Sequence, residues 1–520
     1  MPITITNNWI RITEDTSCYL PIMTDLTSYE RSRTIIIKGR KKKLPEQVFR
    51  AYYQITEDDQ NVIYIPIGLY SFIVDYITLD VEVIDNRVVR NTKLLNTDFH
   101  IINIDEFNDI LPGLTLYEEQ LEAIEKILES KRGIINAATG FGKTAVLCGL
   151  IKILTQINGV CPTVLILEPS IKLVTDVVKV FNSYGMNAVP YSKNRKILEN
   201  TVNVAHPKSL GNDLEKDQNL LDTVEVLLGD EVHHMKSDTF RTPTYNMSNL
   251  VYSVGVSASA ICQEHVSNTR LNQYTYDELL TMGATGPLLM NIPADYLIQK
   301  EILAKPILLR LYNAANEEIR EKYVKDWQEV SKLRLQSDMR NRLVCKSAKI
   351  FSDNKRKVLI LVNTISWSRD LMKLFGMMGI SDKVLASYGS GKFEVYKDGE
   401  FVSGGKDSFD KFDAGEYSIV IGTTHMYEGV DIKNLDVIIL AYGGKAERLQ
   451  IQGLGRALRK SKTGKYAYVV DFTDSGDNFL RNHSITRLKR YIQTIGIPSE
   501  NIFDQIKVSQ IQSIFDKLET

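Results

Sequence analysis

Residues 137–144 read AATGFGKT and directly follow the apolar run at 133–135. Two glycines let backbone N–H groups turn inward around phosphate oxygens, while Lys143 can reach the β- and γ-phosphates of a nucleotide and Thr144 can bind Mg²⁺. Such a loop needs a buried strand before it and a helix after it, which constrains this part of the chain to an α/β sheet. Ala137 replaces the first glycine of the general pattern, and we expect a small residue to suffice there. The alternative is a glycine-rich turn with a solvated lysine.

Apolar strands alternate with helical segments on both sides of this loop. Tyr117–Ser130 has helical periodicity, and the strands expected around it are 133–138, 163–167, 202–204, 224–228 and 253–256. A second series of expected strands comprises 357–362, 417–421, 435–440 and 466–470. This alternation predicts parallel sheets covered by helices on both faces. We therefore expect two α/β units, at 109–305 and 306–475.

The two ends of the chain have a different character. Residues 1–108 contain short β-branched or aromatic segments at 34–37, 61–66 and 81–84, which predict a small β-rich domain. The tail, 476–520, reads as helical. A basic run at 38–43 includes Lys41 and Lys42, and it fits either a solvated turn or a loop that contacts phosphates.

Composition is that of a globular protein, with 43% hydrophobic and 24% charged residues over 520 positions. Five scattered cysteines lack metal-ligand spacing, so we expect reduced thiols in a cytoplasmic compartment. No signal peptide and no apolar run long enough to cross a bilayer is expected, and therefore no membrane partner. The formal net charge of −1 is compatible with a local basic groove.

A carboxylate pair follows the expected strand 224–228. Asp230 and Glu231 would lie at the carboxyl edge of the sheet, where the 137–144 loop also opens. Asp230 can hold Mg²⁺, directly or through water, and Glu231 can act as a base toward the water that attacks a γ-phosphate.

The ordered set of motifs resembles superfamily 2 helicases of the DExH type. AATGFGKT, DEVHH at 230–234 and GVSASA at 255–260 resemble motifs I, II and III, while 421–431 and 452–459 resemble motifs V and VI. The resemblance covers roughly 110–475. It implies ATP and Mg²⁺ as cofactors and two RecA-like parallel-sheet domains in tandem, beside the β-rich N-terminal domain and the short helical tail.

The resemblance also implies roles for individual residues. Those implied in binding ATP are Gln120, which reads adenine in relatives, and Thr139, Gly140, Phe141, Gly142, Lys143, Thr144, Gly429 and Asp431. Those implied in catalysis are Lys143, Asp230, Glu231, Gln452, Arg456 and Arg459, with Mg²⁺ on Thr144 and Asp230. Coupling of the ATP site to nucleic acid is implied for His233, Ser257 and Ser259. Independently, the planar forks of Arg456 and Arg459 suit transferring phosphate, and their spacing puts both on one helix face.

Several loops are expected to grip the sugar–phosphate backbone, largely without regard to base sequence. By resemblance they contain Pro169, Ser170, Lys172, Lys208, Ser209, Asn363, Thr364, Thr423 and Thr424. Each position alone is also compatible with an ordinary helix cap or turn.

The segment Tyr296–Pro306 resembles the crossover of UvsW-, XPB- and poxvirus-type helicases, and His483, Ser484, Arg487 and Tyr491 resemble the tail of that group. UvsW-like proteins act on branched DNA by fork regression, branch migration and R-loop unwinding. The resemblance therefore implies branched or forked DNA as partner, RNA within R-loops, an N-terminal domain that grips duplex, and a monomer.

Residues 393–402 predict a β-hairpin with an Asp-Gly turn between motifs IV and V. It is either an inserted surface hairpin or a wedge at a duplex junction, with Phe393, Tyr396 or Phe401 stacking on bases. For the whole chain, the alternatives are an RNA helicase, a duplex translocase that separates no strands, and an ATP-gated DNA-binding switch. The presence of Glu231, Arg456 and Arg459 argues against the switch.

Overall fold

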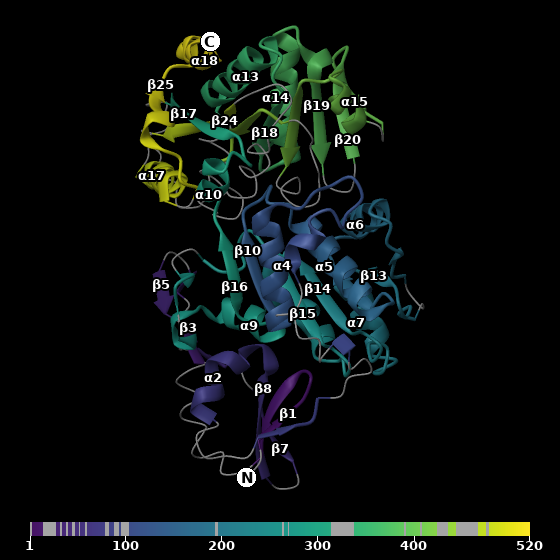
Figure 1. Ribbon diagram of the computed structural model, residues 1–520. Helices are drawn as coiled ribbons and strands as arrows, with labels where there is room; N and C mark the ends of the chain where they lie inside the picture. Colours follow the sequence, from purple (N-terminus) through teal and green to yellow (C-terminus); the bar gives the residue numbers. More distant parts are fainter. Residues whose placement is uncertain are drawn as a thin grey trace. The chain divides into compact units, whose positions relative to one another are not determined.

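The chain forms two compact units in this computed structural model, residues 1–137 with 142–292, and residues 138–141 with 293–520 (Figure 1). The described residues are 3–13, 28–31, 34–37, 40–43, 47–50, 53–57, 60–77, 83–87, 93–94, 103–192, 196–262, 265–268, 270–313, 337–388, 392–405, 408–423, 435–443, 466–474, 478–493 and 495–519. None of the helices in these ranges has the length and hydropathy of a membrane span.

The first unit is built on a seven-stranded parallel sheet with the order β12-β13-β11-β14-β15-β10-β16 (Figure 1). Its strands are β10 (Arg132–Ala137), β11 (Val164–Leu167), β12 (Ala188–Pro190), β13 (Val202–Ala205), β14 (Val226–Asp230), β15 (Tyr252–Ser257) and β16 (Leu288–Ile292). The five expected strands are confirmed, because their apolar runs are buried on both faces as a helix-covered parallel sheet requires. Neither of the two edge strands, β12 and β16, was predicted from the sequence.

Helices connect these parallel strands. They are α4 (Glu118–Ser130), α5 (Lys143–Asn158), α6 (Ile171–Ser183), α7 (Pro207–Leu214), α8 (Asp238–Thr244) and α9 (Tyr276–Ala284). The helix expected from Tyr117 is α4, which ends where Lys131 adopts a left-handed conformation with φ 61°. Short connections of this kind bring the carboxyl ends of the strands to one edge, where a site can assemble.

The N-terminal residues form a separate five-stranded sheet with the order β7-β8-β2-β1-β9. Its strands are β1 (Ile3–Ile5), β2 (Trp9–Ile12), β7 (Tyr53–Glu57), β8 (Gln60–Pro66) and β9 (Val83–Asp85). After β8 come the 3-10 turn η1 (Ile67–Leu69) and helix α2 (Tyr70–Ile77). The isoleucines of β1, β2 and β8 share one apolar core with residues such as Met247 and Met282 of the large sheet's unit. This sheet therefore belongs to the first compact unit.

Polar contacts reinforce this docking. Asn8 Nδ2 donates to the Tyr245 and Met247 carbonyls at 3.3 and 3.0 Å, and the Trp9 and Tyr245 rings lie 4.4 Å apart. The Arg132 guanidinium, at the start of β10, donates to the Asn7 carbonyl at 2.5 Å. The phosphate-loop strand is thus tied directly to the N-terminal sheet.

The basic run lies on a strand and not in a loop. β4 (Thr34–Ile37) pairs antiparallel with β5 (Arg40–Lys43), and Ile37 faces Arg40 in the register. Lys41 and Lys42 therefore belong to the second strand of this pair. The expectation of a loop or turn at Lys41 and Lys42 was wrong, because β-branched residues in β4 provide a pairing partner for the whole cationic run. Two further strands, β3 (Ser28–Arg31) and β6 (Gln47–Arg50), pair antiparallel.

The second unit contains a nine-stranded sheet with the order β21-β20-β19-β22-β18-β23-β24-β17-β25. Its strands are β17 (Lys305–Asn313), β18 (Val358–Val362), β19 (Val384–Tyr388), β20 (Lys392–Lys397), β21 (Glu400–Ser403), β22 (Ile419–Thr423), β23 (Val437–Leu440), β24 (Tyr466–Asp474) and β25 (Ile502–Ile506). All neighbours are parallel except the β19–β20 and β20–β21 pairs. The second expected α/β series is therefore confirmed.

Within its described residues this unit has the helices α10 (Ala294–Gln299), α13 (Asp338–Asp353), α14 (Ile365–Met377), α15 (Ser408–Ala414), α17 (Asn478–Gln493) and α18 (Ile511–Glu519). The tail contains the expected helices α17 and α18, but it is not helical throughout. Between them β25 pairs with β17 and extends the sheet. The alternating apolar residues of 502–506 were too few to reveal an edge strand in advance.

Candidate nucleotide site

The phosphate-loop sequence lies between β10 and α5, as its residues predict. Gly140 and Gly142 have φ angles of 95° and 86°, a left-handed region that glycine enters without steric cost. Gly142 is the N-cap of α5, so the free N–H groups of the helix start face the loop. Lys143 Nζ donates to the Ala137 carbonyl at 3.1 Å, which closes the loop on itself. This is the local geometry of an anion-binding helix N-terminus.

Gln120 packs against this loop from the first turn of α4. Its Oε1 accepts from the Tyr117 N–H at 3.3 Å, and the side chain is 2% exposed. A Cβ on Gly142 would lie 2.4 Å from Gln120 Nε2, so the amide lies directly against the glycine, whose φ of 86° independently disfavours any other residue. The structure therefore brings together two parts of the expected nucleotide site that are separated in sequence.

Asp230 and Glu231 end β14 at the carboxyl edge of the same sheet. β15 lies between β14 and β10, with Asp230 opposite Val256 in the register. Glu231 adopts a left-handed φ of 49°, a strained conformation for a non-glycine residue that is typical of functional sites. Its N–H donates to Asp230 Oδ1 at 2.9 Å.

The expected coupling residues His233 and Ser257 contact the acidic pair. Ser257 Oγ donates to Glu231 Oε2 at 3.1 Å, and His233 Nδ1 lies 2.9 Å from Ser257 Oγ and 3.2 Å from Glu231 Oε2. A hydroxyl has one hydrogen, so His233 must carry its proton on Nδ1 and donate. Ser257 Oγ also accepts from the Ser259 N–H at 3.2 Å. Motif II and the loop after β15 thus form one hydrogen-bonded unit.

The two carboxylates have opposite electrostatic tendencies. Burial and the adjacent Glu231 charge raise the pKa of Asp230. Burial also acts to raise the pKa of Glu231, but the hydrogen bond from His233 and the charge of Lys143 outweigh it and hold that pKa below its usual range. Glu231 is therefore the better ionised member of the pair, as a group that orients an attacking water should be.

The donor set fits Mg²⁺ bound together with a nucleotide. No cluster of three or more His, Cys, Asp or Glu side chains suited to a metal occurs in the described ranges. Mg²⁺ usually takes one or two carboxylates plus substrate phosphates and waters, and needs no all-protein cage. Asp230 offers one carboxylate, and Thr144, the second residue of α5, offers a hydroxyl. The two together satisfy that requirement.

Two buried polar residues at this edge were not singled out from the sequence. Glu168 directly follows β11 and is 1% exposed, and its Oε1 has no hydrogen-bond partner within the described part of the chain. Burial, together with the charges of Asp230 and Glu231, raises its pKa well above the usual range. Asn136, at the end of β10, is 2% exposed and fully hydrogen-bonded. In sequence both look like ordinary residues at a strand end.

The positions expected to contact the nucleic-acid backbone fall into three groups: helix caps, exposed lysines, and half-buried or buried residues. Ser170 and Thr364 are N-caps of α6 and α14, where their hydroxyls accept from the Leu173 and Trp367 N–H groups. Lys172 and Lys208 are exposed near the starts of α6 and α7. The remaining positions are half-buried (Pro169, Ser209, Asn363) or buried (Thr423).

Most of motifs V and VI lies outside the described residues. This holds for Thr424, Gly429, Asp431, Gln452, Arg456 and Arg459. Their assigned roles remain predictions.

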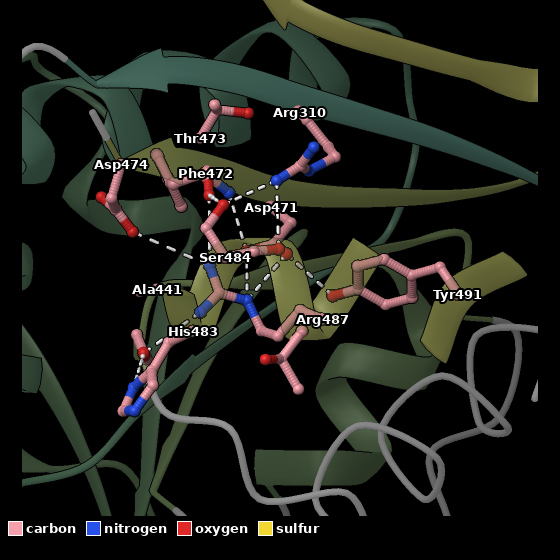
Figure 2. Close-up of polar contacts among 12 residues, drawn as sticks. Arg310, Ala441, Asp471, Phe472, Thr473, Asp474, His483, Ser484, Arg487 and Tyr491 are labelled. Atoms are coloured by element: carbon pink, nitrogen blue, oxygen red, sulfur yellow. Dashed lines mark hydrogen bonds and ion pairs between the residues drawn. The ribbon is translucent and has the colours of Figure 1, made fainter. Parts of the chain in front are cut away.

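The tail residues that carried the resemblance form one buried polar cluster on α17 (Figure 2). Arg487 is fully buried and pairs with Asp471 of β24 through Nε, at 2.9 Å to Oδ2, and Tyr491 donates to the same carboxylate at 3.0 Å. Ser484 Oγ donates to the Phe472 carbonyl at 3.1 Å. Burial would lower the pKa of Arg487, but Asp471 outweighs it and raises the pKa, so the pair stays ionised.

This cluster also holds the backbone that leaves β23. Arg487 donates to the Gly443 carbonyl at 3.1 Å, and His483 Nδ1 lies 3.3 Å from the same oxygen. Arg340 of α13 donates to the Ala441 carbonyl at 3.0 Å and pairs with Asp474 at 2.5 Å. α17 is therefore an integral part of the second unit.

The predicted hairpin at 393–402 is confirmed as β20 and β21. Asp398 and Gly399 have φ angles of 51° and 87°, as a two-residue turn of this type requires. The hairpin is also joined to the large sheet, because β20 pairs with β19. The Phe401 ring lies 5.0 Å from that of Tyr396 and 5.2 Å from the Arg369 guanidinium of α14.

Comparison with known families places these motifs in context. Residues 113–271 match the family model described as the res subunit of type III restriction enzymes. A putative helicase of a Sulfolobus islandicus filamentous virus is 22% identical over 369 residues, covering 67% of this chain and 62% of that protein. The DNA 3'-5' translocase XPB2 of Sulfurisphaera tokodaii is 24% identical, covering 74% of this chain and 87% of that protein. The ATP-dependent DNA helicase uvsW of phage T4 is 21% identical, covering 72% and 74%.

Solved structures show the same fold. Dbp5 of S. cerevisiae bound to RNA and ADP BeF3 matches with a TM-score of 0.54 at 16% identity, covering 81% of this chain and 98% of that one. The two parallel sheets are therefore RecA-like domains in tandem. The chain spans 62% of the length of the viral relative, less than two thirds of it.

Proposed function

We propose that the chain, which is similar to superfamily 2 helicases of the UvsW and XPB type, is an ATP-driven DNA translocase that remodels branched DNA. One observation carries the proposal. Glu231, Ser257 and His233 are hydrogen-bonded to one another at the sheet edge where Lys143 and the phosphate loop open. A protein that only binds nucleotide does not need an acid that orients the water attacking the γ-phosphate and that is also hydrogen-bonded to a separate segment.

The residues of this chain have defined tasks in the proposed reaction. Lys143 binds the β- and γ-phosphates, Gln120 recognises the adenine, and Glu231 orients the attacking water. Bound Mg²⁺, held by Asp230 and Thr144, supplies charge neutralisation at the transferring phosphate. Each of these residues except Thr144 has a described contact that fixes its side chain or backbone.

Catalysis is completed from the second RecA-like domain. Arg456 and Arg459 stabilise the transferring phosphoryl group, a contribution of about 10³-fold or more in rate, and Gln452 helps to place the water. Closure of the two domains would then depend on ATP and their opening on hydrolysis. The nucleotide would thus shift the equilibrium between a closed and an open state. If both domains grip the DNA backbone, each cycle moves the strand.

The choice of DNA, and of branched DNA, rests on three supports. The relatives that match most of this chain are named as a DNA helicase and a DNA translocase. The N-terminal sheet is docked on the first RecA-like domain by buried contacts, so it moves with that domain. The basic residues of β5, Arg40–Lys43, would supply phosphate contacts. RNA enters the proposal as the displaced strand of an R-loop.

A substrate panel tests the proposal. ATPase stimulation and strand displacement are measured on single strands, plain duplex, forks, four-way junctions and R-loops, at one fixed salt concentration. We expect forks, junctions and R-loops to be remodelled and to stimulate turnover more than plain duplex. An equal response to single-stranded RNA would overturn the branched-DNA assignment.

A duplex translocase that separates no strands is the second candidate. It is favoured by the similarity to XPB2, which is named a DNA 3'-5' translocase, and that name also suggests movement in the 3'-5' direction. Displacement of a bound protein from plain duplex, without strand separation on forks, would identify it.

A further inference from the structure

Asn136 connects three strand ends at the nucleotide site. Its Oδ1 accepts from the Ala260 N–H at 3.1 Å, and its Nδ2 donates to the Ile261 carbonyl at 3.3 Å and to Asn291 Oδ1 at 2.8 Å. A primary amide offers two donor hydrogens and one carbonyl oxygen, and here every one of them is used. The side chain is 2% exposed, so water cannot substitute for a lost partner.

The three partners belong to two functional elements. Ala260 and Ile261 continue the loop that starts at Ser257, which is bonded to Glu231. Asn291 lies on β16, the last strand before the second unit begins at residue 293. Asn136 itself precedes Ala137, whose carbonyl accepts from Lys143 Nζ.

We propose that Asn136 is a positioning residue that couples the phosphate loop to the 257–261 loop and to β16. A shift of the phosphate loop when nucleotide binds or leaves would be passed through this amide, because its three bonds are buried and use all of its donors and its acceptor. The proposal deepens the proposed function and rests on it. It assigns to a residue outside motifs I, II and III the task of keeping motifs I and III in register.

The chain offers a matched control in Asn203 of β13. That side chain is also 2% exposed and makes several backbone hydrogen bonds, with the Val164, Leu198 and Thr201 carbonyls and the Leu198 N–H. It touches none of the nucleotide-site residues. Asn203→Ala and Asn136→Ala therefore remove a comparable buried amide, one within the proposed coupling and one outside it.

The experiment compares these variants in the full chain. ATP turnover is measured with and without forked DNA, ATP KM is taken from the same data, and thermal unfolding is followed alongside. We expect Asn136→Ala to lower the ratio of DNA-stimulated to basal turnover about tenfold, with KM within about twofold of wild type. Asn203→Ala should lower the unfolding temperature but leave that ratio unchanged. The same ratio in both variants would overturn the proposal.

Variants at Asn291 provide a second test should Asn136→Ala fail to fold. Asn291→Ala removes the bond between Asn136 and β16 and should lower the stimulation ratio in part. Asn291→Asp keeps an oxygen that can accept from Asn136 Nδ2 and should retain it. Equal ratios in these two variants would contradict a role for that bond. Lys143→Ala separates the two levels: turnover at the wild-type rate in that variant defeats the proposed function, whatever Asn136 does.

Discussion

Ser257 Oγ donates a 3.1 Å hydrogen bond to Glu231 Oε2, which joins the acid of motif II to the loop that follows β15. Ser257 Oγ also accepts hydrogen bonds from His233 Nδ1 and from the Ser259 N–H. One hydroxyl therefore fixes the orientation of the group proposed to position the attacking water.

Ser257→Ala is expected to lower ATP turnover about tenfold with little change in KM, because Glu231 loses a hydrogen bond to a charged group. Ser259→Ala is the control. Ser259 Oγ is buried and has no hydrogen-bond partner in the ranges described, so its removal should change turnover about twofold at most. Steady-state phosphate release measures both, and equal losses in the two variants would contradict this account.

The docking of the N-terminal sheet depends on Gly68. A Cβ at Gly68 would lie 2.1 Å from the Met282 carbonyl oxygen of α9, and backbone cannot yield there. Gly68→Ala should reduce the free energy of unfolding by about 1–3 kcal/mol in urea titrations. Gly211→Ala is its control, since nothing lies within 4 Å of the added atom, and it should be neutral or stabilising. Equal stability of the two variants would refute the close contact.

The Asp471–Arg487 pair predicts an acid-sensitive second domain. Burial acts to raise the pKa of Asp471, but Arg487 outweighs it and lowers that pKa. A depressed carboxyl pKa contributes stability above the unfolded value of about 3.9 and loses it as pH falls through the folded value. The unfolding free energy of the wild type should therefore drop below about pH 4.

Asp471→Asn should remove part of that acid dependence. At neutral pH the variant should be less stable by about 3–5 kcal/mol, because the buried Arg487 loses its nearest carboxylate and keeps only Asp474, at 3.7 Å. Chemical unfolding between pH 7 and pH 3 measures both effects. If the unfolding free energy of the variant falls with decreasing pH as steeply as that of the wild type, Asp471 is not responsible for the acid sensitivity.

The 393–402 hairpin can be tested as a wedge without dismantling the sheet that β20 joins. Phe401→Leu keeps an apolar side chain against α14 but removes a ring able to stack on a base. The wedge hypothesis predicts slower unwinding of forks with DNA-stimulated ATPase unchanged, and trimming 393–402 to a short turn should abolish unwinding. If both variants unwind forks at the wild-type rate, the wedge hypothesis is wrong and 393–402 is an ordinary surface hairpin.

Many strand positions in both sheets could be predicted because buried parallel strands are continuous apolar runs, as in β14 and β18, although the buried strands β17 and β19 were not predicted. Lys143, Asp230 and Glu231 could be placed together since parallel strands end at one edge. The edge strands β16 and β25 were missed, because half-exposed strands have weaker patterns. Nor does local sequence reveal which side chains satisfy a distant backbone. Asn136 bonds to residues 124, 125 and 155 positions away, and only the fold brings them together.

The most direct measurement of the central claim is made on Lys143→Ala with a forked DNA whose regression releases a labelled strand. Lys143 lies at the start of α5, and the proposed grips on DNA lie elsewhere, so the variant should bind the fork with an affinity within about tenfold of wild type. It should hydrolyse no ATP and release no strand. Strand release at the wild-type rate would contradict the claim that ATP hydrolysis at this loop moves DNA.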